Sequence, residues 1–128
     1  MRRALGYDAH MRFAILTHDH PLLHWDLLLE CGGICRTWRL LAPPDTLAAL
    51  RAETFPDHRV FYLDYEGPVT GGRGRVSRWD GGRLVWTTAR HDFIRVLCQG
   101  HRWNGVLTLR QIQGHWWATF APRQSPIR

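Results

Sequence analysis

The chain contains 128 residues, a length that predicts a single domain (1–128) with a folded core at about 12–121. Hydrophobic residues make up 45% of the sequence, and no apolar run approaches the roughly 20 residues that cross a bilayer, so we expect a soluble, cytoplasmic protein that does not contact membranes. The formal net charge is +6 and all 17 basic residues are arginine, which excludes lysine chemistry and favours a phosphate-bearing or nucleic-acid partner.

Taken in chain order, the sequence predicts short strands separated by turn signals. Gly32-Gly33 indicates a tight hairpin, and Asp80-Gly81-Gly82 indicates a second one. Asp45 follows two prolines and is expected to cap a short helix over Thr46–Leu50, whereas Gly67–Gly74 is expected to form a loop. Strands are expected over Arg12–Thr17, His24–Glu30, Ile34–Leu40, Arg59–Tyr65, Arg75–Trp79, Arg83–Thr88, Phe93–Cys98, Val106–Ile112 and Trp116–Phe120.

This series of elements predicts a mainly β fold, a small closed or nearly closed antiparallel β-barrel with one short helix. Closure would pair the edges that so many short strands otherwise expose. The tails, about 1–10 and 122–128, are expected to attach loosely. The odd number of cysteines, without a Cys-x-x-Cys pair, predicts that Cys31, Cys35 and Cys98 are ordinary buried thiols.

Two histidines and an aspartate form the first candidate site. On a strand that starts at residue 24, His24 and Asp26 point to the same face, and antiparallel pairing with the preceding strand would bring His18 beside His24. Two imidazoles and one carboxylate with open coordination positions are typical of a divalent metal site, and the same set also serves non-haem iron oxygenases. The alternative is that His18 and His20 cap a loop and His24 is a hydrogen-bonded core histidine.

A second candidate cluster lies between Asp57 and Gly67. On a regular strand, His58, Tyr62, Asp64 and Glu66 would share one face. An imidazole and a phenol directed at a metal-bound phosphate would supply proton transfer and contacts to phosphate oxygens. The alternative is an amphipathic strand with its polar side in water.

These two motifs together resemble a known family. His18, followed after five residues by His24-Trp25-Asp26, is similar to the metal motif of the 3′-phosphoesterase domain of bacterial DNA ligase D. The stretch with Asp57-His58 and Tyr62-x-Asp64-Tyr65-Glu66-Gly67 is similar to the Asp-His and Tyr-x-Asp-Phe-Glu-Gly segment of that domain. The resemblance spans about 13–120 and also includes Leu29-Glu30, Gly33, Trp38, Arg78-Trp79-Asp80 and the segment 105–109.

The resemblance implies a compact β-barrel with a central crevice. It implies that His18, His24 and Asp26 hold Mn²⁺, with Zn²⁺ or another divalent metal as the alternative, and that His58 and Tyr62 act around the phosphate. The implied activity is the healing of 3′ ends of DNA or RNA in strand-break repair, by removal of a terminal phosphate or a terminal ribonucleotide. The implied partners are these 3′ ends and a separately encoded DNA ligase or polymerase, and we expect a monomer.

The sequence also departs from the family. Leu28 stands where the family has an arginine of its phosphate site, so the alternative function is a catalytically impaired, nucleic-acid-binding relative. The long N-terminal arm that the family uses to remove ribonucleotides is missing, so we expect a 3′-phosphatase rather than a phosphodiesterase. The loop Thr70–Gly74 replaces a longer glycine segment, and it either cradles phosphate through its backbone or forms a flexible turn.

Arg39 is the candidate replacement for the missing arginine. If Gly32-Gly33 is a two-residue hairpin loop, Leu28 faces Thr37 and Asp26 faces Arg39. Diagonal cross-strand neighbours are about 7–8 Å apart, so the Arg39 guanidinium would reach the point that an arginine at position 28 would occupy. The alternative is that Arg39 is a solvent-facing strand residue.

Overall fold

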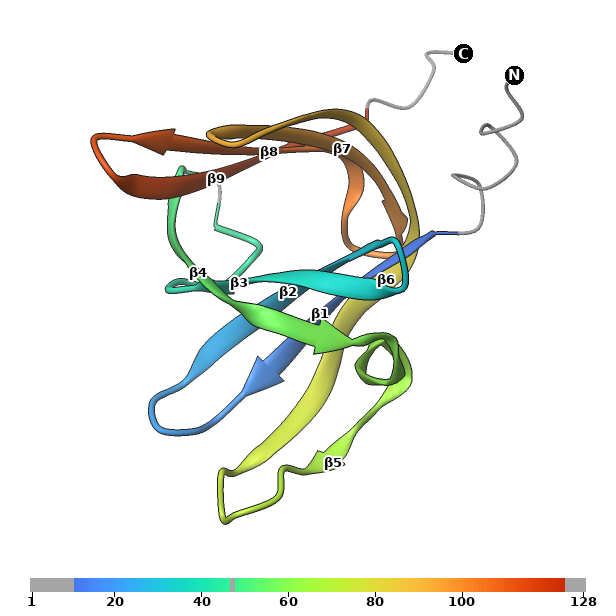
Figure 1. Cartoon of the computed structure of the whole chain (residues 1–128), viewed down its shortest axis with the longest axis vertical. Helices are drawn as coiled ribbons and strands as arrows, with labels where there is room; N and C mark the ends of the chain where they lie inside the picture. Colours follow the sequence, from blue (N-terminus) through green and yellow to red (C-terminus); the bar gives the residue numbers. More distant parts are fainter. Residues whose placement is uncertain (1–10, 47, 124–128) are drawn as a thin grey trace.

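The computed structural model describes residues 11–46 and 48–123, and most of them lie in β-strands (Figure 1). One short 3₁₀-helix, η1, interrupts the strands at Val60–Asp64. The strands are β1 (Arg12–His18), β2 (His24–Cys31), β3 (Ile34–Leu40), β4 (Leu50–Arg59), β5 (Gly67–Pro68), β6 (Arg75–Arg90), β7 (Phe93–Gly100), β8 (Asn104–Ile112) and β9 (His115–Pro122).

Eight of these strands close into an antiparallel barrel. Neighbouring strands follow the order β1-β2-β3-β4-β9-β8-β7-β6, and β6 pairs back with β1 to complete the ring. The short strand β5 pairs with the first residues of β6 and stands outside the ring. The predicted mainly β barrel is therefore confirmed, and closure pairs the strand edges that an open sheet would expose.

The barrel interior is filled by apolar side chains. Side chains alternate between the two faces of a strand, so every second residue of each ring strand points inward. The buried inward-facing cluster consists of Phe13, Ile15, Leu27, Leu29, Trp38, Leu40, Leu50, Ala52, Leu84, Ile94, Val96, Cys98, Trp103, Leu107, Leu109, Trp116 and Ala118.

A second apolar cluster covers part of the outer face of the barrel. It consists of Ala14, Leu16, Leu28, Cys35, Leu63 and Val76. The segment that contains η1 and β5 folds over this face, so the middle of each of the strands β1 and β2 is buried on both sides and forms a short apolar run, Phe13–Leu16 and Leu27–Leu29. Figure 1 shows η1 and β5 at the end of the molecule opposite to β7, β8 and β9.

The strand predicted over Arg59–Tyr65 is wrong. Strand β4 starts at Leu50 and ends at Arg59, and the following residues turn into η1. Residues three apart lie on the same side of a 3₁₀-helix, so Val60 and Leu63 both face the outer apolar cluster, where Leu63 is fully buried. Burial against β1 and β2 has overridden the strand preference of this aromatic and β-branched segment.

The hairpin predicted around Asp80-Gly81-Gly82 is also wrong, because β6 runs through these residues without a break. The glycines mark a close approach between backbones rather than a turn. A Cβ atom at Gly82 would collide with the backbone carbonyl of Gln99 on β7. Asp80 is buried and accepts hydrogen bonds from the backbone N–H groups of His101, Arg102 and Trp103 at 2.7–3.0 Å.

Three smaller predictions can also be compared. The helix expected over Thr46–Leu50 is not found in the described residues: Leu50 begins β4, and Leu47 lies outside them. Pro122 ends β9 instead of starting a loose tail, and the tails 1–10 and 124–128 lie outside the described residues. Within the described ranges, no helix is long and apolar enough to cross a membrane.

The three cysteines are free thiols, as predicted. Cys35 and Cys98 are buried, whereas Cys31 is half-buried. Burial raises the pKa of Cys35 to about 12 and raises the pKa of Cys98 as well, so both remain protonated at neutral pH. They are packing residues of the two apolar clusters rather than nucleophiles.

Replacement of Asp80 tests how strongly its carboxylate holds the β7–β8 turn. Asp80→Ala leaves three backbone N–H groups without their acceptor, so we expect the free energy of unfolding to fall by about 3–5 kcal/mol. Urea unfolding of the two proteins measures the change. Asp45→Ala, which truncates an exposed carboxylate, is the matched control, and an equal loss in the two variants would contradict this role of Asp80.

Candidate active site

A pocket of about 560 Å³ lies on the outer face of the barrel wall. Its floor consists of Leu16 and His18 on β1, Asp26 on β2 and Arg39 on β3, all on the strand face opposite to the inward-facing cluster. Its other side comes from residues 55–59 of β4, Tyr62 of η1 and the loop after β5. The resemblance implied a central crevice, but the barrel interior is filled with apolar side chains and the pocket lies outside it.

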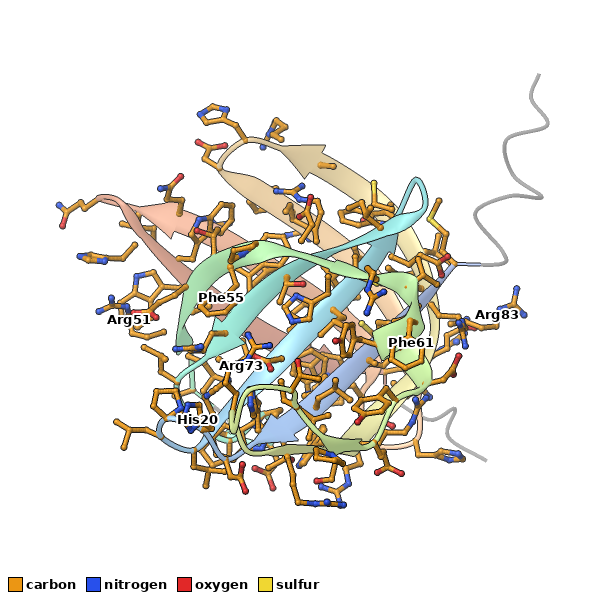
Figure 2. All side chains as sticks on the ribbon, turned by 60° about the horizontal axis from the view of Figure 1, so that its bottom comes forward. His20, Arg51, Phe55, Phe61, Arg73 and Arg83 are labelled. Carbon is orange, nitrogen blue, oxygen red and sulfur yellow. The ribbon has the colours of Figure 1, made fainter. Side chains whose placement is uncertain are left out.

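Figure 2 shows His20, Phe55 and Arg73 grouped on one side of the molecule, where they line this pocket. The hydrogen bond from the Arg75 backbone N–H to Asp19 Oδ1, at 2.8 Å, ties the β1–β2 loop to β6 and lowers the pKa of the Asp19 carboxyl. The loop that carries His20 is therefore fixed at the edge of the pocket.

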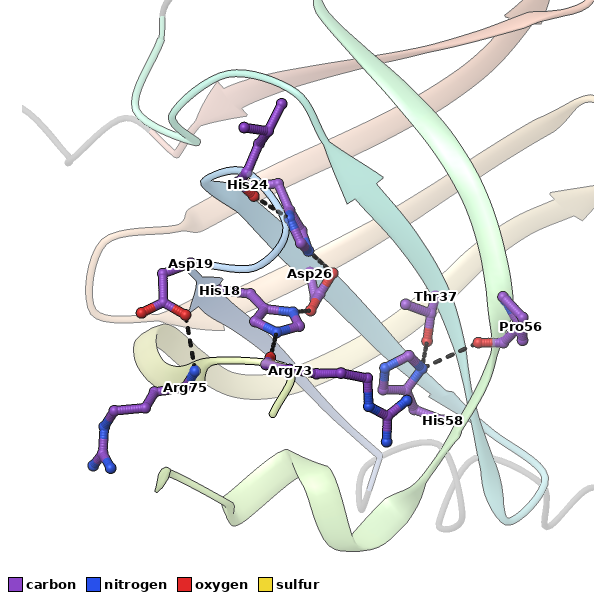
Figure 3. Close-up of polar contacts among 10 residues, drawn as sticks. His18, Asp19, His24, Asp26, Thr37, Pro56, His58, Arg73 and Arg75 are labelled. Atoms are coloured by element: carbon purple, nitrogen blue, oxygen red, sulfur yellow. Dashed lines mark hydrogen bonds and ion pairs between the residues drawn. The ribbon is translucent and has the colours of Figure 1, made fainter. Parts of the chain in front are cut away.

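The three predicted metal ligands come together at one end of the pocket. His18 pairs directly with His24 across β1 and β2, and Asp26 lies two residues farther along β2, so all three share one face. His18 Nδ1 is 3.1 Å from Asp26 Oδ2, and His24 Nε2 is 3.0 Å from Asp26 Oδ1. One ligand atom from each residue lies within 4.8 Å of the others, and Figure 3 shows the carboxylate between the two rings.

The hydrogen bonds of the two rings fix where their protons lie. His24 Nδ1 is 2.9 Å from the Leu22 carbonyl oxygen, and His18 Nε2 is 2.9 Å from the Arg73 carbonyl oxygen. A carbonyl oxygen only accepts, so each of these nitrogens carries a proton. When each ring carries only this proton, His24 Nε2 and His18 Nδ1 present lone pairs to Asp26, which is itself an acceptor.

This arrangement leaves buried acceptors facing each other. His24 and Asp26 are 3% and 4% exposed, and His24 Nε2 and Asp26 Oδ1 are buried without a hydrogen-bond partner. Either an additional proton on a ring or a cation between these atoms would relieve the repulsion. Two imidazole nitrogens and a carboxylate, with carbonyl oxygens holding the remote ring nitrogens, are a donor set that suits Mn²⁺ or Zn²⁺.

His58 and Tyr62 line the opposite wall of the pocket. His58 Nδ1 lies 3.1 Å from both the Pro56 carbonyl oxygen and Thr37 Oγ1, and the Thr37 hydroxyl donates to the Cys35 carbonyl. Both partners of Nδ1 are therefore acceptors, so Nδ1 carries the proton and Nε2 is the free position of the neutral ring. The Tyr62 ring meets the His58 ring edge-on, with centroids 5.7 Å apart.

The other two residues of the predicted second cluster do not join the pocket. Because residues 60–64 form η1 rather than a strand, Asp64 turns away and pairs with Arg12 at 2.8 Å. Glu66 accepts a hydrogen bond from the Arg78 backbone N–H at 2.7 Å. The expectation that His58, Tyr62, Asp64 and Glu66 share one face is therefore wrong for the last two.

Arg39 lies where the hairpin register predicted. Asp26 pairs with Arg39 and Leu28 pairs with Thr37, and Arg39 lines the pocket with its Cζ atom 4.1 Å from the centroid of the Phe55 ring. Its Nε is buried without a hydrogen-bond partner. Leu28 is fully buried in the outer apolar cluster.

Two further arginines in the pocket, Arg59 and Arg73, were missed in the sequence. Figure 3 shows the Arg73 side chain extending from the His18 side of the pocket toward His58. Its Nε and a terminal nitrogen donate to the carbonyl and the hydroxyl of Thr70, at 2.7 and 3.1 Å. In the sequence, the glycine-rich loop Thr70–Gly74 was identified as a candidate phosphate-binding segment. The loop was expected to contribute backbone N–H groups, however, rather than the Arg73 guanidinium.

Known proteins match this chain over most of its length. The sequence profile of the family described as DNA Ligase D 3′-phosphoesterase domain matches residues 16–117. The multifunctional non-homologous end joining protein LigD of Pseudomonas aeruginosa is 31% identical over 111 residues, and the multifunctional non-homologous end joining DNA repair protein LigD of Mycobacterium tuberculosis is 30% identical over 115 residues.

These matches cover 83% and 82% of the chain but only 13% and 15% of the two relatives, so the chain corresponds to one part of much longer proteins. The matched region contains the paired histidines, Asp26, His58 and Tyr62, in agreement with the resemblance found in the sequence. The chain belongs to the DNA ligase D 3′-phosphoesterase domain family.

Proposed function

We propose that the protein is a metal-dependent 3′-phosphatase that heals 3′ ends of DNA or RNA in strand-break repair. The observation that carries the proposal is the pair of imidazole nitrogens that lie 3.0 and 3.1 Å from the buried Asp26 carboxylate, at the end of a pocket lined by three arginines. The lone pairs and the carboxylate would bind a cation, and the guanidinium groups would bind the oxygens of a phosphate.

A divalent ion bound to His18, His24 and Asp26 would neutralise charge on the phosphate and polarise the bond to be broken. Arg39, Arg59 and Arg73 would hold the phosphate oxygens from the other sides of the pocket. Tyr62 would contribute a phenolic hydroxyl to the same oxygens. In the overall reaction water replaces the 3′ oxygen on phosphorus, and His58 would transfer the required proton at Nε2.

Mn²⁺ is the metal we propose, and Zn²⁺ is the alternative that the same ligands accept. The product would be a 3′ hydroxyl, the group that a ligase or a polymerase uses, so an enzyme activity of one of these classes would act next. The same pocket geometry serves DNA and RNA, because the groups described above contact the terminal phosphate rather than the sugar.

The alternative is a nucleic-acid-binding relative without turnover. Its support is Leu28, which is buried at the position where the family has an arginine. The three arginines in the pocket argue against it, since they supply cationic groups from β3, β4 and the loop after β5. We therefore favour the enzyme.

Removal of one metal ligand tests the cation site. His24→Ala should lower the affinity for Mn²⁺ by at least about 100-fold and abolish phosphate release, because it removes a buried ligand and not only a supporting group. Isothermal titration with Mn²⁺ measures the affinity. His91→Ala, in an exposed turn, is the control, and unchanged Mn²⁺ affinity in His24→Ala would contradict the assignment.

Replacement of His58 separates chemistry from binding. His58→Ala should lower the rate of phosphate release by about 100-fold or more, because general acid–base catalysis contributes factors of this size, while Mn²⁺ affinity remains unchanged. Release of inorganic phosphate from a 3′-phosphorylated oligonucleotide measures the rate. A parallel loss of thermal stability and Mn²⁺ affinity would identify His58 as a structural residue instead.

Replacement of Arg39 tests whether this residue takes the place of the missing arginine. Arg39→Ala should lower kcat/KM by roughly 100-fold, because a directed donor to the phosphate oxygens is lost, and Arg39→Lys should recover part of the activity. The exposed Arg83 provides the control Arg83→Ala. Full activity of Arg39→Ala would show that Arg39 is only a strand residue.

A further inference from the structure

A row of alternating arginine and aromatic residues crosses five strands on the outer face of the barrel. Arg90 pairs with Phe93, Phe93 with Arg110, Arg110 with Trp117, and Trp117 with Arg51. Each residue lies directly opposite the next, so the five side chains form one line from β6 through β7, β8 and β9 to β4. We call these five residues the arginine–aromatic row.

The row faces outward. Its neighbours along the strands point into the barrel, as Ile94 does on β7, Leu109 on β8 and Trp116 on β9, and alternation places the row on the opposite face. Strand spacings of about 4.8 Å make the row about 19 Å long. Arg90 and Arg110 are exposed, whereas the rings of Phe93 and Trp117 are half-buried.

The cations of the row lie close to its rings and lack carboxylate partners. The Cζ atoms of Arg90 and Arg110 are 5.3 and 5.2 Å from the centroid of Phe93, and Arg95, two residues farther along β7, is 5.1 Å from the same ring. Arg51 lies 5.5 Å from the centroid of Trp117. None of these four arginines takes part in the ion pairs found among residues 11–46 and 48–123.

Positive groups that alternate with flat rings match the chemistry of a single-stranded nucleic acid. Guanidinium groups bind the phosphates of the backbone, and unpaired bases stack on aromatic rings or on guanidinium planes. Three arginines around one ring, none of them in an ion pair, also favour an anionic partner. We propose that the arginine–aromatic row binds the single-stranded nucleotides that precede the 3′ end in the pocket.

The row connects to the pocket along β4. Arg51, Glu53 and Phe55 lie on the same face of β4, and Phe55 lines the pocket. The Cα atoms of Arg51 and Phe55 are separated by about 13 Å at the usual strand rise. Figure 2 shows Arg51, Phe55 and Arg73 on the same side of the molecule, whereas Arg83 projects from the opposite edge. Glu53 is the acidic residue on this path.

The inference rests on the proposed function, which identifies the nucleic acid as one with a 3′-phosphate. Two substrates distinguish binding by the arginine–aromatic row from phosphate release in the pocket. A dinucleotide with a 3′-phosphate fills the pocket but does not extend to the row. A single strand of about 12 nucleotides with the same 3′-phosphate is long enough to cover both, given the few nucleotides that such surfaces bind. Fluorescence anisotropy of the labelled strand in EDTA measures binding without hydrolysis, and phosphate release with Mn²⁺ measures activity on both substrates.

The variant Arg90→Gln/Arg110→Gln should weaken binding of the longer strand and reduce the slope of log Kd against log salt by about 1.4, because two phosphate contacts are lost at about 0.7 each. Phe93→Leu should weaken binding by about tenfold without changing that slope, since stacking is not ionic. The control Arg83→Gln/Arg123→Gln removes the same charge from exposed positions outside the row. Activity on the dinucleotide should be unchanged in all three proteins.

Equal salt slopes and affinities for Arg90→Gln/Arg110→Gln and its control would overturn the inference. Tighter binding of a blunt duplex than of the single strand, with the same loss in the variant, would overturn the assignment to single strands. If the row variant loses affinity while no protein releases phosphate, the proposed activity fails and the row remains a binding surface.

Discussion

The register of β2 between β1 and β3 determines where the functional side chains lie. In this register His18 faces His24 and Asp26 faces Arg39, on the outer side of the barrel. The alternate residues of the same strands fill the barrel interior. A shift of one residue would exchange the two faces and place the histidines and the carboxylate in the apolar core. The core therefore fixes the position of the pocket, because only one register buries the correct side chains.

Within this frame, hydrogen bonds to the backbone orient the side chains that we propose bind a cation. The carbonyls of Leu22 and Arg73 accept the ring protons of His24 and His18 and direct the opposite nitrogens toward Asp26. Buried acceptors that face one another are costly unless positive charge lies between them. In the proposed function, the arginines of the pocket have a different role, since they would bind a phosphate beside the three ligands. The two halves of the proposed site would therefore have separate functions.

Much of this architecture could be predicted from the sequence, but only where the signals are local. The Gly32-Gly33 turn and the alternation of β1–β3 correctly predict that His18, His24 and Asp26 lie together and that Arg39 pairs with Asp26. Residues 60–64 were assigned to a strand because the segment is rich in aromatic and β-branched residues. The 3₁₀-helix forms instead because it buries Leu63 in the outer apolar cluster, a contact between distant segments that the local sequence does not reveal. Gly81 and Gly82 were assigned to a turn because glycine is common in turns. Glycine is also required where two backbones approach closely, and this is its role here. The arginine–aromatic row depends on the pairing of β4 with β9, strands far apart in the sequence, and on a bulge in β6.

Nuclear magnetic resonance of the imidazole nitrogens tests the central claim most directly. Long-range ¹H–¹⁵N spectra report which nitrogen of each ring carries a proton and which binds a metal. On addition of Zn²⁺, a diamagnetic ion that suits the same ligands, the signals of His24 Nε2 and His18 Nδ1 should move to metal-bound shifts, while His24 Nδ1 and His18 Nε2 remain protonated. Unchanged nitrogen shifts with Zn²⁺, or metal binding at the nitrogens that face the two carbonyls, would contradict the account.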